Sequence, residues 1–144
     1  MKIYRVDGVE LLDVPGDTLV GANLQGAHLK YADLAYIDLS YADLRDANLQ
    51  HAYLLGAKLQ NVNLCMANLE GADLTEANLA CVNFEGANLK RVTLQRANLE
   101  GANLQGANLQ GADFTDANIT GASFEWADLQ EAYLQGAKLQ RSIK

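Results

Sequence analysis

Two histidines and two cysteines are the residues best suited to carry chemistry in this chain. His28 and His51 could ligate a metal, but a metal site needs three or four ligands that converge. Cys65 and Cys81 could act as nucleophiles, but a catalytic cysteine needs a histidine partner, and both histidines lie earlier in the sequence. We therefore predict no catalytic residue, no metal site and no cofactor, and we expect that the chain is not an enzyme.

The elements that position every side chain are short repeats. From Ala22 to Arg141 the sequence keeps an unbroken period of five residues through 24 repeats. The central residue of each repeat, position i, is Leu in 20 of 24 cases, and position i−2 is Ala in 20 of 24. Position i−1 is Asn or Asp in 17 of 24, and position i+2 is Gly nine times. The period therefore governs almost the whole chain.

A period of five residues excludes both an α-helix and a continuous strand. In a helix, a step of five rotates by roughly 140°, so the apolar positions would spread over all faces. In a strand, a step of five moves the Leu to the opposite face. Three extended residues followed by a bend satisfy the pattern, because Ala and Leu then point to one central axis. The sequence predicts an all-β solenoid with a Leu/Ala core.

The repeat A-(D/N)-L-x-x resembles the pentapeptide repeat family, and the resemblance covers residues 22–141. It implies a right-handed quadrilateral β-helix with four repeats per coil, hence about six coils. We predict a capping segment at 1–18, the β-helix at 19–141 and a tail at 142–144. The spacing of Val62 and Val82 agrees with a coil of 20 residues, but Val62 and Val92 would equally suit a 15-residue period.

The first 18 residues break the repeat and contain two short apolar runs around Asp7 and Gly8. An Asp-Gly pair between such runs is typical of a β-hairpin, which would cover the open edge of the first coil. One turn of helix near residues 9–14 is the alternative. Pro15 and Gly16 then lead the chain into the first coil.

Composition limits the partners of this chain. The formal net charge is −7 and the sequence pI is about 4.6, which argues against direct nucleic-acid binding. No apolar stretch of 18 residues and no secretory signal occur, so we expect no membrane partner and a cytoplasmic location. A core close-packed with Leu and Ala leaves no cavity for a small-molecule substrate.

Function must then lie on the outer walls or at the ends. The candidate interaction surface consists of the outward aromatic residues Tyr31, Tyr36, Tyr41, Trp126 and Tyr133, although these rings could also pack against neighbouring side chains. Only a few residues follow the last repeat, so we expect the last coil to be protected by an end-to-end homodimer or by another protein, with Ile143 contributing.

We interpret the chain as a non-catalytic structural or protein-interaction module with an unknown protein partner. The resemblance implies one alternative, because some family members mimic double-stranded DNA and modulate DNA gyrase or topoisomerase. Those members dimerise through a C-terminal helical segment that has no counterpart here. The resemblance also indicates a cyanobacterial type of protein, since the family is abundant in cyanobacteria.

Overall fold

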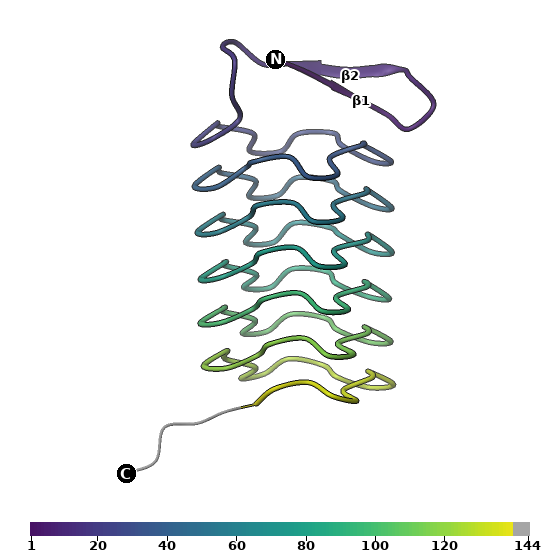
Figure 1. The fold of residues 1–144 in the computed structure, drawn as a ribbon, viewed down its shortest axis with the longest axis vertical. Helices are drawn as coiled ribbons and strands as arrows, with labels where there is room; N and C mark the ends of the chain where they lie inside the picture. Colours follow the sequence, from purple (N-terminus) through teal and green to yellow (C-terminus); the bar gives the residue numbers. More distant parts are fainter. Residues whose placement is uncertain (140–144) are drawn as a thin grey trace.

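The computed structural model describes residues 1–139 as a stack of coils with a β-hairpin at the N-terminal end (Figure 1). The hairpin consists of strand β1 (Lys2–Tyr4) and strand β2 (Glu10–Asp13). The predicted tail at 142–144, and Ile143 within it, lie outside the described residues.

Each coil contains 20 residues and four repeats. Parallel β-bridges join residues 20 apart through the whole stack, from Asn23–Asp43 at one end to Asn118–Lys138 at the other. Residues 20–139 therefore form six coils with four walls each. This register excludes the 15-residue period and confirms the predicted fold class, an all-β right-handed quadrilateral β-helix.

Every corner of the coils is a tight turn with a left-handed residue. In a typical turn the Ala27 N–H donates to the Leu24 carbonyl at 3.0 Å, and the residue before Ala27 has positive φ, which is the pattern of a type II turn. Position i+2 has positive φ at all 24 corners from residue 21 to residue 136. Fourteen of these residues are not glycine. None of them is β-branched, because branching at Cβ makes this conformation most costly.

The central axis is filled by the Leu and Ala positions. These side chains are buried from Leu19 to Ile119, each at most 4% exposed, and Phe84 and Phe114 fit into the same column. No polar or charged side chain is buried anywhere in residues 1–139. The interior therefore stabilises the stack by apolar burial alone and offers no chemistry of its own.

The Asn and Asp residues at position i−1 stabilise the turns and, in several columns, form ladders. Within a repeat the side-chain oxygen accepts a hydrogen bond from the backbone two residues on, as Asn98 Oδ1 does from the Glu100 N–H at 3.1 Å. Between coils Asn118 donates to Asn98 at 3.1 Å, and Asn98 donates to Asn78 at 3.3 Å. The Asn columns are thus structural amide ladders.

The N-terminal segment is the hairpin, not the short helix. Strands β1 and β2 pair antiparallel, with Ile3 opposite Leu12. The hairpin joins the edge of the first coil, where the Asp33 N–H donates to the Tyr4 carbonyl at 2.8 Å and the Val6 N–H donates to the Tyr31 carbonyl at 3.1 Å. The pairing gives edge groups of the first coil hydrogen-bond partners and covers one end of the core.

The other end of the stack is less covered. Leu134 and Leu139 occupy the central position that is buried in the coils above, yet they are 46% and 62% exposed. Phe124 and Leu129, in the same coil, are partly buried. The two ends of the described β-helix therefore differ, one carrying a hairpin and the other exposing apolar side chains.

We expect core substitutions to report this difference in stability. Leu74→Ala should lower the free energy of unfolding by about 2–5 kcal/mol, because it opens a cavity in a close-packed layer. Leu134→Ala should cost less than about 1 kcal/mol, since this side chain is already half exposed. Urea unfolding followed by circular dichroism measures both values, and equal losses would contradict the assignment of Leu134 to an open layer.

The corner residues allow a second test. Asp46 has a φ of 60°, a conformation that costs an L-residue about 1–2 kcal/mol and a β-branched residue more. Asp46→Val should therefore lower the urea midpoint, whereas Asp46→Gly should leave it unchanged or raise it. A valine variant as stable as the glycine variant would show that the corner does not require this conformation in solution.

Candidate interaction surfaces

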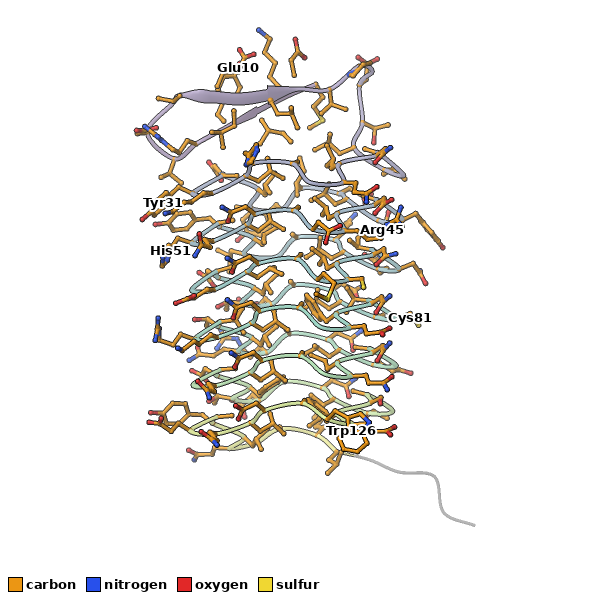
Figure 2. The ribbon with its side chains drawn as sticks, turned by 180° about the vertical axis from the view of Figure 1, so that it is seen from behind. Glu10, Tyr31, Arg45, His51, Cys81 and Trp126 are labelled. Carbon is orange, nitrogen blue, oxygen red and sulfur yellow. The ribbon has the colours of Figure 1, made fainter. Side chains whose placement is uncertain are left out.

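The histidines and cysteines do not form a common site. His51 stacks on the ring of Tyr31, with the ring centroids 5.3 Å apart and an interplanar angle of 16°. Both cysteines are free thiols, and partial burial raises the pKa of Cys65 above its usual value of 9.0, which disfavours the nucleophilic thiolate. Figure 2 shows Cys81 on the opposite edge of the rod from His51. Nowhere in residues 1–139 do three metal-ligating side chains converge.

Tyr31, Tyr36 and Tyr41 are exposed at three successive corners of the first two coils, so they do not form one patch. The Lys30 ammonium lies 5.5 Å from the centre of the Tyr31 ring, and His51 covers this ring from the next coil (Figure 2). The Tyr36 ring extends along the rod over Gly56, where an added Cβ would lie 2.6 Å from the ring. Part of this aromatic area is thus used in packing, which was the second interpretation of these residues.

Trp126 and Tyr133 both belong to the coil that exposes Leu134 and Leu139. Trp126 is 80% exposed and projects near the lower end of the rod (Figure 2), and Tyr133 is 64% exposed. Large exposed aromatic side chains beside exposed Leu are typical of protein interfaces. The role of all five predicted aromatic residues as an interaction surface stays a prediction.

One wall carries a column of side chains that sequence analysis did not single out. Here β-bridges stack position i−1 of successive coils in one line, which we call the acid–aromatic ladder: Asp33, Tyr53, Asp73, Thr93, Asp113 and Tyr133. Carboxylates alternate with uncharged side chains, so no two Asp residues are adjacent. Stacked like charges would destabilise the stack. The available signal was the spacing of 40 residues between successive Asp residues.

The carboxylates on the walls are held in the ionised form by local hydrogen bonds. A hydrogen bond from the Arg45 guanidinium lowers the pKa of Asp43 below 3.8, and the Ser40 hydroxyl does the same for Asp38. Partial burial alone would raise the pKa of Asp113, but hydrogen bonds from Thr115 and Gln95 outweigh it, so this pKa is also lowered. These groups are therefore negatively charged at neutral pH.

A groove of about 270 Å³ lies at one corner of the lower coils, where Gly111 leaves a gap between larger side chains. Its volume is slightly below the usual range for small-molecule sites, and cationic and anionic side chains face it together. The residues that line it are Lys90, Arg91, Gln110, Gly111, Glu131 and Tyr133. We assign it no ligand.

These features define a class of protein: a β-solenoid built from five-residue repeats, with an apolar axis and functional residues on its walls and ends. The chain belongs to the pentapeptide repeat family. The family described as pentapeptide repeats matches in eight copies, over residues 18–40, 27–64, 67–106 and 107–143. This result confirms the family that the sequence pattern indicated.

Three solved structures illustrate the similarity. HetL, a pentapeptide repeat protein involved in heterocyst differentiation regulation in the cyanobacterium Nostoc sp. strain PCC 7120, is 34% identical, with a TM-score of 0.31. The match covers 83% of this chain but only 60% of HetL. The pentapeptide repeat protein Rfr23 from the cyanobacterium Cyanothece 51142 is 32% identical, with coverage of 84% and 86% and a TM-score of 0.40.

The third structure is trypsin-treated QnrB1, a plasmid-mediated fluoroquinolone resistance protein. It is 24% identical, with coverage of 82% of this chain and 67% of QnrB1 and a TM-score of 0.52, and this likeness concerns the fold alone. No curated protein sequence matches this chain significantly. Within residues 1–139, no helix has the length and hydrophobicity needed to cross a membrane.

The lowered carboxylate pKa values predict a loss of stability in acid. Hydrogen bonding to Arg5 lowers the pKa of Asp7 from 3.8 to about 2. A carboxyl group with a depressed pKa in the folded state stabilises the fold above its unfolded pKa, and this contribution is lost as the pH falls through the folded pKa. The thermal midpoint should therefore fall between about pH 5 and pH 2.

Asp7→Asn provides the comparison for this pH profile. Its thermal midpoint should lie below that of the unmodified protein at pH 6, and the two curves should converge as the pH approaches 2. Differential scanning calorimetry at a series of pH values measures both curves. A midpoint that is constant or rises from pH 5 to pH 2 would contradict the assignment.

Proposed function

We propose that this chain is a protein-interaction module that acts without catalysis and that its lower coil, residues 120–139, is its main binding surface. A single observation carries the proposal. The central Leu residues of this coil, Leu134 and Leu139, are exposed, whereas the equivalent side chains in the coils above are buried. Exposed Leu beside Trp126 and Tyr133 forms an apolar edge that a partner protein would cover.

The backbone of this coil also supports pairing with another β-structure. In the coil above, the Leu109 N–H donates to the Asp128 carbonyl at 2.8 Å and the Phe114 N–H donates to the Tyr133 carbonyl at 2.7 Å. The N–H groups of Leu129 and Leu134 occupy the same positions one coil lower, and no coil lies below them in residues 1–139. A partner that adds a strand to this edge would give them acceptors.

The partner that fits this edge is a second copy of the chain. The hairpin covers part of the opposite end, where the Tyr4 carbonyl and the Val6 N–H already pair with the first coil. Head-to-tail stacking is therefore hindered, and two copies would meet through their lower coils about a two-fold axis. The arrangement buries the same apolar residues of both copies.

Sedimentation velocity over micromolar concentrations tests this homodimer. We expect a concentration-dependent dimer for the unmodified protein and a monomer for Leu134→Arg, because a charge at the centre of the paired edges would be desolvated. Val20→Arg is the matched control, since Val20 is also an exposed apolar residue but lies in the first coil. A clean monomer for the unmodified protein, or equal effects of both variants, would exclude this interface.

Modulation of a DNA topoisomerase by DNA mimicry is the second candidate, and the charge of the ladder wall is the observation behind it. Outward Asp33, Asp73, Glu76, Asp113 and Asp116 against Arg96 give this wall a net charge of five minus one, or −4. Duplex DNA would carry roughly 17 charges over six coils spaced at about 4.8 Å, so the match in charge density is poor. Inhibition of gyrase supercoiling by micromolar protein would nevertheless establish this function.

The proposal includes the location and the classes of ligand. A cytoplasmic location is supported by the two free cysteines, which are too few for a disulfide framework. The acidic balance supports a protein partner over nucleic acid, and the small groove supports a protein partner over a small-molecule substrate.

A further inference from the structure

The acid–aromatic ladder differs from the amide ladders in what it leaves available for binding. In an amide ladder each Asn donates to the Asn of the coil above, so the side chains satisfy one another. A carboxylate cannot donate, and Asp73 accepts only local bonds through Oδ1, from the Thr75 N–H at 3.0 Å and the Thr75 hydroxyl at 2.6 Å. Within residues 1–139, neither Asp33 nor Asp73 forms an ion pair.

The aromatic members of the ladder complete a binding surface for cations. Tyr53 lies in register between Asp33 and Asp73 and is 45% exposed, and Tyr133 lies beside Asp113 at the other end. A ring flanked by carboxylates attracts Lys or Arg, because both its π-face and its neighbours favour positive charge. An acidic ladder without rings would lack this second contribution.

The spacing of the ladder selects the backbone of the ligand. Adjacent coils are about 4.8 Å apart, so successive Asp residues in alternate coils are about 9.6 Å apart. A polyproline II helix repeats every three residues, or about 9.3 Å, and would drift by only about 0.6 Å over the ladder. A strand presents one face every ~6.7 Å, and an α-helix returns to one face after seven residues, about 10.5 Å. Polyproline II fits best.

The basic side chains near the ladder do not oppose this ligand. Arg91 and Arg96 lie at the corners on either side of Thr93, in the middle of the ladder. The Arg91 guanidinium pairs with Glu70 at 2.5 Å, and the Arg96 guanidinium pairs with Glu76 at 3.4 Å. Their charges are therefore compensated within the rod.

We propose that the acid–aromatic ladder binds an extended, proline-rich segment of a partner protein that carries a basic residue at every third position. The basic side chains contact Asp33, Asp73 and Asp113, and prolines between them pack on the exposed Tyr rings, as prolines do in aromatic grooves that recognise polyproline II. The ladder lies on a side wall, so this site is separate from the lower coil proposed for dimerisation.

Fluorescence anisotropy with labelled peptides tests the proposal. The ligand is a peptide of four Arg-Pro-Pro repeats, and its composition-matched control has all its arginines adjacent. Binding should be about tenfold or more tighter for the repeat peptide, because only its charges match the ladder. An acidic control of four Glu-Pro-Pro repeats should not bind. Absence of binding, or equal binding of the two basic peptides, would overturn the proposal.

Matched variants locate the site. The triple variant Asp33→Asn, Asp73→Asn and Asp113→Asn keeps the side-chain oxygen that accepts the turn hydrogen bond, so the fold should persist. It should weaken binding about tenfold or more, since it removes all three carboxylates. Tyr53→Asn should weaken binding by a smaller factor of about three or more through loss of the ring.

A second triple variant, Glu85→Gln, Glu100→Gln and Glu125→Gln, removes the same charge from positions outside the ladder wall and should change binding by less than about twofold. Equal weakening by both triple variants would reduce the effect to net charge and overturn the proposal. Circular dichroism of every variant confirms the fold. The result is independent of the dimer, which Leu134→Arg tests by sedimentation.

Discussion

The left-handed residue at each corner is the constraint on which this molecule depends. A chain of L-residues does not turn by a quarter every five residues unless one residue in five has positive φ, and position i+2 does so at all 24 corners. Glycine meets this requirement without strain, but 14 corners carry larger residues, including Trp126 and Tyr36. Their cost is offset by burial of Leu and Ala and by the hydrogen bonds between coils.

Because the corners fix the coil at 20 residues, equivalent positions stack into columns, and the columns are the functional units of the surface. Residues 20 apart in the sequence become direct neighbours, as Asp33, Tyr53 and Asp73 do, while adjacent outward residues point from different parts of a coil. A linear motif search therefore finds no site in this chain. Side chains that could recognise a partner are distributed along the whole sequence and are assembled only by the register.

The period of Leu and Ala predicted the fold because it states directly which side chains share the axis. It did not determine the number of repeats per coil, since Val62 agrees with both Val82 and Val92, and only the bridges decide between them. The Asp-Gly turn identified the hairpin correctly. Counting charges by wall found the acidic side but not the alternation of Asp with Tyr, because a sum discards order. The stacking of His51 on Tyr31 depends on rotamers that no periodicity specifies.

Hydrogen-bond capacity explains why one column can bind while its neighbours serve the fold. The amide of Asn98 both accepts from Asn118 and donates to Asn78, so an amide ladder extends through the stack and has little left for a partner. Replacement of Asn by Asp keeps the turn, since Asp113 Oδ1 still accepts the Thr115 N–H at 2.9 Å, but it ends the ladder. A carboxylate offers acceptors and no donor. Alternation then avoids repulsion between adjacent coils, and the charges it leaves on the wall can be neutralised only by cations from outside that column.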